Sequence, residues 1–240
     1  MKTSYLLLLL QRSIVLILAA LIFAISINFP QVKVGITQAI LNHNIAESKI
    51  PEWARLVDIK TLNSEIILDI RYATTNNFLN QKLYPVAKCA LRKEVAEKLS
   101  QVQADLKTIG LGLKVYDCYR PLSVTKKMWE VLPDSRYVAN PEKGSRHNRG
   151  AAVDVTLVDL NTGKELEMPT EFDDFSEKAW RNYLGNKLEV QRNSELLVEK
   201  MNKYGFEALI TEWWHFDAIG WQKFAILDVP LDRITEFQKI

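Results

Sequence analysis

Two short stretches of the sequence combine side chains that bind metal ions with side chains that move protons. Residues 145–154 hold His147 and Asp154 seven positions apart, and residues 212–215 end in His215. Two imidazoles and one carboxylate leave the fourth position of a tetrahedral zinc ion to water, which is the pattern of a catalytic rather than a structural site. This set therefore predicts one zinc ion per chain, with a water molecule made acidic by the metal.

Glu212 remains as a second carboxylate, three positions before His215. It could take a proton from the attacking water and pass it to a departing amine. On a regular strand positions 212 and 215 face opposite sides, so this role requires a bulge, a strong twist or a strand that ends before His215. Arg120 is the best candidate to balance the oxyanion, because its charge is permanent and its planar fork holds oxyanions. The alternative for Arg120 is a surface ion pair, but the pattern as a whole predicts a zinc hydrolase.

The competing interpretation is that the histidines are hydrogen-bonded core residues. The chain has three histidines, and two of them, His147 and His215, lie in these stretches. Each has a carboxylate close by in the sequence and sits in strand-like apolar sequence, so a core role would have to explain both. A metal site explains them better. His43 lies far from either stretch and is expected to be exposed.

The surrounding sequence predicts helices and strands in mixed order. Alternation over 153–157 puts Asp154 and Thr156 on one face of a strand and three apolar side chains toward the core. Apolar residues at steps of three and four predict an amphipathic helix over 93–108. The other expected elements are strands over 65–70, 113–117 and 206–216, and helices over 122–132 and 194–203, the last capped by Asn193 or Ser194.

This mixture, without a regular alternating repeat, predicts an α+β fold with a mainly antiparallel sheet and flanking helices. We expect a single zinc-peptidase domain over residues 56–240, preceded by a spacer over 31–55.

Residues 1–30 are unlike the rest of the chain. Their only charges are Lys2 and Arg12, and both precede the apolar run 13–29, which is the order of an export signal. Small residues at 24–26 suit a cleavage site, whereas the seventeen-residue run is also at the lower limit for an uncleaved membrane anchor. Both interpretations stay open.

In either case, positive charge on the N-terminal side places the body of the protein outside the cytoplasm. We therefore expect an exported, periplasmic or extracytoplasmic protein that contacts the membrane only through its N-terminal segment, with residues 5–29 as the anchor if the signal is not cleaved.

Charge and cysteine content narrow the class of protein further. The chain has 31 basic and 29 acidic residues, and without residues 1–26 the numbers are 29 and 29. A chain with no basic surplus is not expected to bind nucleic acid. Its two cysteines, Cys89 and Cys118, favour one disulfide in an exported protein, and the alternative is two unpaired buried thiols.

Four motifs resemble those of a known enzyme family. Ser145-x-His-x-x-Gly-x-Ala-x-Asp154 followed by Glu212-x-Trp-His215 resembles the zinc D,D-peptidases of peptidoglycan metabolism. Asp117-Cys-Tyr-Arg-Pro121 and Asp69-Ile-Arg-Tyr-Ala-Thr-x-Asn-Asn-Phe78 narrow the resemblance to the D-alanyl-D-alanine dipeptidase branch. The similarity covers residues from about Leu56 to the C-terminus, and the four motifs come in the same order.

The resemblance implies a role for each of these positions. His147, Asp154 and His215 would bind zinc. Glu212 would be the general base and acid, and Arg120 would stabilise the tetrahedral intermediate. The remaining three would bind the ends of the substrate, with the serine near the carboxylate and the tyrosine and aspartate at the free amine: Ser145, Tyr72 and Asp173.

The expected reaction is hydrolysis of the D-Ala-D-Ala dipeptide outside the cytoplasm, in cell-wall turnover or dipeptide scavenging. The nearest alternative is a D,D-carboxypeptidase or endopeptidase that uses the same zinc site on peptidoglycan stem peptides. Tyr72 and Asp173 argue against it, because that function needs an open groove. A wall-binding module with a purely structural zinc is also less favoured, because Glu212 and Arg120 are present.

Overall fold

The computed structural model describes residues 50–234, so the expected export or anchor segment, most of the spacer and His43 lie outside the described residues. Contacts divide the chain into two compact units, Met1–Pro51 and Glu52–Ile240, and the described helices and strands belong to the second. The first of them is a 3-10 helix at Glu52–Ala54, ahead of the expected boundary at residue 56. Within residues 50–234, no helix has the length and apolar character needed to cross a membrane.

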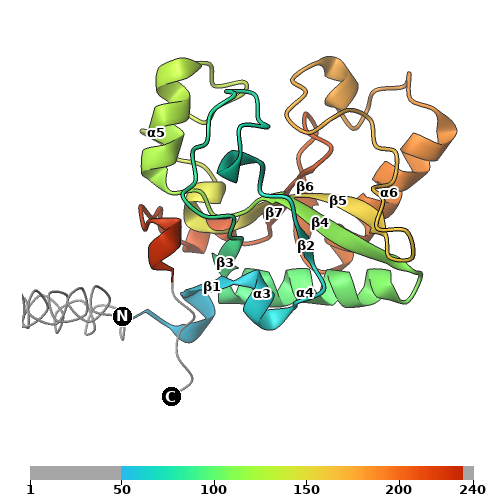
Figure 1. Ribbon diagram of the computed structural model, residues 1–240, viewed down its shortest axis with the longest axis horizontal. Coiled ribbons are helices and arrows are strands. Elements are labelled where there is room, and N and C mark those ends of the chain that lie inside the picture. The colour runs from blue at the N-terminus through green and yellow to red at the C-terminus, as the bar shows by residue number, and fades with distance from the viewer. Residues whose placement is uncertain (1–49, 235–240) are drawn as a thin grey trace, which may run out of the picture. The chain divides into compact units, whose positions relative to one another are not determined.

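A five-stranded sheet with the order β2-β4-β5-β7-β6 runs through the centre of this unit (Figure 1). Its strands are β2 (Ile67–Leu68), β4 (Leu111–Asp117), β5 (Ala152–Asp159), β7 (His215–Ala218) and β6 (Phe206–Ala208). Only the β2–β4 pair is parallel among the described strands. A separate antiparallel pair joins β1 (Leu56–Asp58) to β3 (Ala90–Arg92). The predicted α+β fold with a mainly antiparallel sheet is confirmed.

The helices flank the central sheet. They are α3 (Ile59–Leu62), α4 (Lys93–Lys107), α5 (Leu122–Val131) and α6 (Leu188–Lys203). Figure 1 shows α4 along one side of the sheet, with α5 and several long loops on the other. The helix predicted over 93–108 and the helix predicted over 122–132 are confirmed to within a residue at each end.

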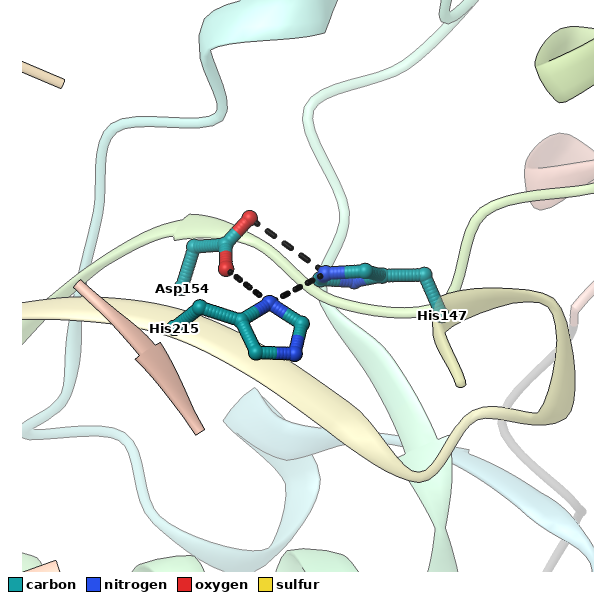
Figure 2. A group of neighbouring side chains, drawn as sticks. All are labelled: His147, Asp154 and His215. Carbon is teal, nitrogen blue, oxygen red and sulfur yellow. Dashed lines mark hydrogen bonds and ion pairs between the residues drawn. The ribbon is translucent and has the colours of Figure 1, made fainter. Parts of the chain in front are cut away.

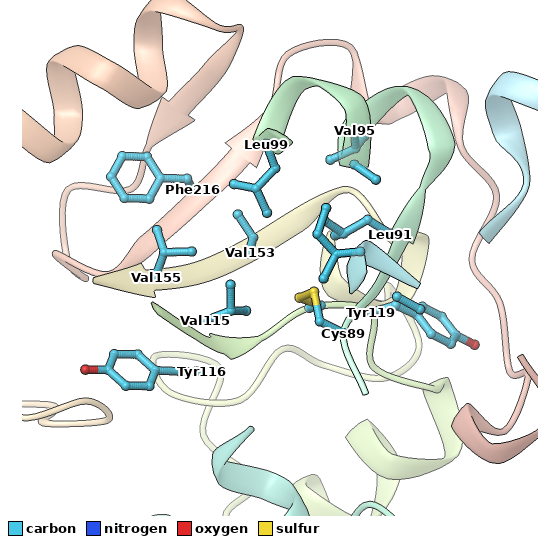
Figure 3. Packing of buried hydrophobic residues seen from close by; sticks show 14 of the residues in the cluster. Cys89, Leu91, Val95, Leu99, Val115, Tyr116, Tyr119, Val153, Val155 and Phe216 are labelled. Carbon is cyan, nitrogen blue, oxygen red and sulfur yellow. A yellow bond between two sulfur atoms is a disulfide. The ribbon is translucent and has the colours of Figure 1, made fainter. Parts of the chain in front are cut away.

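The core lies between α4 and the sheet. Figure 3 shows Leu99 of α4 directed at Val153 of β5, with Val115 of β4 and Val155 close by. All four side chains are fully buried. The predicted alternation along β5 is confirmed, because these valines face the core while Asp154 faces the opposite side, where the functional cavity lies.

The helix predicted over 194–203 begins six residues earlier, at Leu188, so the predicted cap at Asn193 or Ser194 is wrong. Lys187 precedes the first turn and makes no side-chain capping hydrogen bond. The helix is instead defined by a buried stripe at steps of four, three and four residues: Val190, Ser194, Leu197 and Met201.

The predicted strands over 65–70 and 206–216 are also shorter than expected. Only Ile67 and Leu68 pair with β4, and the chain then turns through a 3-10 helix at Arg71–Ala73. Residues 206–216 form two antiparallel strands, β6 and β7, joined by a loop. That loop contains two fully buried tryptophans, which give it strand-like hydrophobicity. The Trp214 carbonyl accepts one hydrogen bond from the Val155 N–H at 3.0 Å, but regular pairing with β5 begins at His215.

Candidate active site

A cavity of about 710 Å³ lies between the sheet, α5 and the loops. The structure brings together all eight residues to which the sequence assigned a metal, catalytic or substrate role. They line this one cavity: Tyr72, Arg120, Ser145, His147, Asp154, Asp173, Glu212 and His215. Its size is within the range of small-molecule sites.

Three buried side chains that line the cavity form a tight triangle, which Figure 2 shows. His147 begins a 3-10 helix, whereas Asp154 and His215 are directly paired across β5 and β7. The Nε2 atom of His147 lies 3.2 Å from Nδ1 of His215. The Asp154 oxygens lie 3.0 Å from His215 Nδ1 and 3.5 Å from His147 Nε2.

These separations fit a zinc ion. Ligand atoms about 2.0–2.1 Å from a tetrahedral zinc ion stand about 3.3 Å apart, which is within the spread of the three distances. Burial opposes ionisation of Asp154, but the charge of His147 and hydrogen bonds with His147 and His215 hold the pKa of Asp154 well below its usual value. The donor set is therefore two imidazoles and one carboxylate, facing one point.

Further contacts fix which nitrogen each histidine presents. Nδ1 of His147 lies 2.7 Å from the carbonyl oxygen of Cys118, so Nε2 is the atom left to the cavity. Nε2 of His215 lies 3.0 Å from Asp217, which in turn pairs with Arg146 at 3.4 Å. Such outer partners orient histidine ligands in metal sites.

The turn between His147 and β5 requires glycine. Gly150 has a φ of +65°, and a Cβ atom there would lie 2.6 Å from Leu56 Cδ2 and 3.3 Å from the backbone nitrogen of Arg92. The buried Asn148 side chain holds the same loop, because it accepts from the Ser145 N–H at 2.8 Å and donates to the Arg120 carbonyl at 2.8 Å. Ser145 and Arg120 are thereby fixed relative to each other.

Glu212 lies in the loop before β7, so the expected conflict between positions 212 and 215 does not arise. Strand β7 begins at His215, and the backbone before it is free of the alternation of a strand. A Glu212 carboxylate oxygen lies 3.9 Å from His215 Nδ1, and the side chain is 22% exposed. Burial raises the pKa of Glu212, and the charge of His215 opposes that rise.

Arg120 is buried, so it is not a surface ion pair. Asp117 accepts hydrogen bonds from its Nε at 3.1 Å and its Nη2 at 2.7 Å. Burial opposes the charge of Arg120, but the Asp117 carboxylate keeps the pKa of Arg120 well above its ordinary value. The guanidinium lies 5.0 Å from the centre of the Tyr72 ring. Asp117 also accepts a 2.7 Å hydrogen bond from Tyr84, which holds the carboxylate in place.

Cys89 and Cys118 form the predicted disulfide, with Cα atoms 5.2 Å apart. Cys118 follows the last residue of β4, and its carbonyl is the one that orients His147. The bridge therefore ties the end of β4 to the segment before β3, next to the metal site.

Tyr72 and Asp173 both line the cavity and contact each other, although 101 positions separate them in the sequence. The tyrosine hydroxyl donates to one carboxylate oxygen at 3.0 Å. The Tyr72 ring is buried in edge-to-face contact with three other rings: Phe78, Tyr84 and Phe172. Asp173 has a φ of +63°, an uncommon conformation for a non-glycine residue. Burial and the charge of Asp154 raise the pKa of Asp173 well above its usual value.

The structure separates the two aspartates of residues 172–175, which we call the acidic loop. Asp173 lines the cavity, whereas Asp174 accepts a hydrogen bond from the Ser176 N–H at 2.8 Å and does not line it.

Sequence reasoning missed three supporting residues. Asp217 lies two positions after His215 on one strand and therefore shares its face, a signal that could have found it. Asp117 lies three positions before Arg120 in a motif already singled out, but its pairing was not predicted. Asn148 had no such signal, because the two groups to which it donates, the Arg120 carbonyl and the Thr125 hydroxyl, lie 28 and 23 positions away.

The chain is similar to known dipeptidases. A model of the M15 peptidase family, D-ala-D-ala dipeptidase, matches residues 52–240. The D-alanyl-D-alanine dipeptidase of Escherichia coli is 33% identical over 166 residues, which cover 69% of this chain and 86% of that protein. The D-alanyl-D-alanine dipeptidase of Enterococcus faecalis is 30% identical over 171 residues, covering 63% of this chain and 85% of that protein.

A solved structure of the vancomycin resistance D,D-dipeptidase VanXYg in complex with a D-Ala-D-Ala phosphinate analog is more distant. It is 20% identical, with a TM-score of 0.36, and the match covers 56% of this chain and 52% of that one.

Proposed function

The chain belongs to the D-ala-D-ala dipeptidase family of M15 peptidases, and we propose that it hydrolyses D-alanyl-D-alanine to two D-alanines with one zinc ion outside the cytoplasm. The observation that carries the substrate assignment is the Tyr72–Asp173 pair, which lies in the same cavity as the metal triangle and Glu212. A zwitterionic dipeptide needs an anionic group at one end, a donor at the other and the metal between them.

His147, Asp154 and His215 would hold the zinc ion through Nε2, a carboxylate oxygen and Nδ1. When bound, zinc supplies a Lewis acid for the scissile carbonyl and lowers the pKa of the attacking water. Two histidines and one carboxylate leave the site a net positive charge, which suits an oxyanion.

Glu212 takes the proton of the attacking water and returns it to the nitrogen of the departing D-alanine. Its distance of 3.9 Å from His215 Nδ1 puts the carboxylate beside the metal position without making it a ligand. Arg120 stabilises the oxyanion, because Asp117 occupies its Nε and Nη2 and leaves Nη1 for the substrate.

The ends of the dipeptide are bound by neighbouring groups. Asp173 accepts the substrate ammonium, and the Tyr72 hydroxyl fixes the orientation of that carboxylate. Ser145, which lines the same cavity, donates to the substrate carboxylate. This arrangement favours a free amine over an acylated one.

The proposed location rests on the order of charged and apolar residues in 1–29. The Cys89–Cys118 bridge supports it, because structural disulfides persist in oxidising compartments. A fusion of residues 1–55 to alkaline phosphatase tests it: activity of the fusion in intact cells supports export, and an inactive, cytoplasmic fusion contradicts it.

The test of the reaction compares D-Ala-D-Ala with N-acetyl-D-Ala-D-Ala on purified, zinc-loaded protein. We expect rapid release of D-alanine from the free dipeptide and little from the acylated one, with loss of activity on chelation. Preference for the acylated substrate would instead make the enzyme a carboxypeptidase on stem peptides.

A further inference from the structure

The segment that carries Glu212 and His215 is a closed loop. We call residues 209–215 the Glu212 loop. Its two ends meet where the Leu209 N–H donates to the His215 carbonyl at 3.2 Å. The Glu212 carboxylate makes no hydrogen bond to another described residue, and the Glu212 carbonyl accepts one from the His215 N–H at 3.4 Å within the loop. The position of the side chain therefore depends on how the ends of this loop are held.

Arg181 contacts both ends of the Glu212 loop. Its Nε donates to the Leu209 carbonyl at 2.8 Å, and its Nη2 donates to the His215 carbonyl at 3.1 Å. Its backbone N–H also donates to the Ile210 carbonyl at 2.9 Å. The guanidinium carbon lies 4.4 Å from the centre of the Phe216 ring, which packs it against the start of β7. One side chain thus joins the point where the loop leaves the fold to the point where it returns.

Arg181 differs from Arg92, another arginine that is held by backbone carbonyls. Arg92 uses all three of its guanidinium nitrogens on carbonyl oxygens, at 2.6–2.8 Å. The Nη1 atom of Arg181 is buried and has no hydrogen-bond partner among the described residues. Burial lowers the pKa of Arg181 to about 10, and the Glu212 carboxylate opposes this fall. A buried donor without a partner costs free energy, so the Arg181 side chain is held in this place by its two carbonyl contacts and not by full satisfaction of its donors.

Residues 179–181, the short segment around Arg181, also connect the Glu212 loop to the amine-binding end of the cavity. The Trp213 N–H donates to the Ala179 carbonyl at 3.1 Å, so residues 179–181 run along the Glu212 loop. Trp180 lines the cavity, and the segment follows the acidic loop that contains Asp173. The chain therefore runs from the loop that holds Asp173, the proposed amine-binding group, to residues 179–181, which hold the loop of Glu212, the proposed proton carrier.

We propose that Arg181 is a positioning residue for the reaction, which holds the Glu212 loop so that Glu212 faces the scissile bond and His215 faces the metal. This inference rests on the proposed roles of Glu212 and His215. Arg181 touches neither substrate nor metal, and it acts through the two carbonyl oxygens that it binds.

The test uses Arg181→Met, which keeps the apolar stem on Phe216 but removes every side-chain donor, and Arg181→Lys, which keeps the charge without the fork. Arg192→Ala is the matched control, because Arg192 is an exposed arginine of the nearby helix α6. Steady-state kinetics on D-Ala-D-Ala, zinc content and hydrogen–deuterium exchange are measured on each protein.

We expect Arg181→Met to lower kcat by about 10- to 100-fold, as for outer contacts that orient catalytic groups, with KM within about twofold of the parent. Zinc should still bind at one ion per chain, and the lysine variant should recover part of the loss. Amide exchange over 209–215 should accelerate in Arg181→Met but not over β4 or β5, and Arg192→Ala should change nothing.

An unchanged kcat in Arg181→Met, or a fall in kcat without faster exchange over 209–215, would overturn the proposal. If the methionine variant does not fold, the same comparison is decided on the lysine variant. If the parent protein itself shows no zinc-dependent hydrolysis, the proposed function fails, whereas the exchange measurement still tests how Arg181 holds the loop.

Discussion

The metal side and the substrate side of the cavity are held in place by different means. On the metal side, Asp154 and His215 are paired on adjacent strands, and His147 is oriented by the carbonyl of Cys118. On the substrate side, Tyr72 and Asp173 come from separate loops and meet through a hydroxyl–carboxylate contact. Rigid strands set ligand distances closely, whereas loops allow a pocket to be shaped for one kind of substrate.

Glu212 stands between the two sides. It lies in a loop, as the substrate groups do, but the strand that begins at His215 and the Arg181 side chain fix both ends of that loop. Glu212 therefore sits in a loop whose two ends are fixed, while its own carboxylate is left without a hydrogen bond to another described residue and faces the cavity.

The largest expected effect comes from the proton carrier. Glu212→Gln should lower kcat by about 100- to 10,000-fold, because the amide cannot accept the proton of the attacking water. Zinc content should stay at one ion per chain, since Glu212 is not a ligand. Glu207→Gln is the control, because Glu207 is exposed on β6. Turnover of Glu212→Gln equal to that of the parent would remove Glu212 from the mechanism.

A smaller effect is expected from the outer contacts of the metal side. Asp217→Asn should raise the zinc Kd by about 10- to 100-fold, because the amide holds Nε2 of His215 less strongly than the carboxylate does. Competition with a chromophoric chelator measures this Kd, and Asp232→Asn, at an exposed position, serves as the control. If the two variants bind zinc equally well, the metal side is less dependent on its outer contacts than the structure indicates.

The disulfide should affect stability more than turnover. It closes a segment of 29 positions, so replacing both cysteines by serine should cost about 3 kcal/mol in the free energy of unfolding. Because the Cys118 carbonyl remains, we expect kcat of the folded variant within about threefold of the parent. Urea unfolding and kinetics measure the two quantities, and a large loss of kcat with unchanged stability would contradict this account.

The substrate side should show a stability cost that depends on pH. Burial and Asp154 raise the pKa of Asp173, so the ionised form, which its proposed contact with the substrate ammonium requires, costs the folded protein free energy. The stability that this group contributes is present below its ordinary pKa of about 3.9 and is lost as the pH rises through its pKa in the folded protein.

Asp173→Asn should therefore raise Tm at pH 7, by about 2–4 °C if the cost is near 1 kcal/mol, and the gain should shrink as the pH is lowered toward 4. Calorimetry at both pH values measures it. A variant less stable than the parent at pH 7 would show that the ionised Asp173 is well compensated.

The same division explains what the sequence could predict. The residues of the metal side could be predicted because His147, Asp154, Glu212 and His215 lie in short motifs. Strand alternation also predicts which way Asp154 faces. The resemblance pointed to Tyr72 and Asp173 one by one, but no local pattern joins residues 101 positions apart. Their contact follows from how two loops fold over the sheet.

The errors have related causes. The start of α6 was missed because the helix lacks a capping side chain and is defined by burial against the core. The Glu212 loop was taken for strand because its tryptophans are apolar, although regular pairing with β5 begins only at His215. Arg181 gave no signal, because an arginine that binds carbonyl oxygens needs no particular partner in the sequence.

The most direct test of the account is whether Asp173 acts through the free amine of the substrate. Asp173→Asn and the parent are compared on D-Ala-D-Ala and on N-acetyl-D-Ala-D-Ala. We predict that the variant loses about 10- to 100-fold in kcat/KM on the free dipeptide, the loss expected for a hydrogen bond to a charged group, and changes by less than about twofold on the acylated one. An equal loss on both substrates would show that Asp173 supports the site without binding the amine, and would contradict the division between the two sides of the cavity.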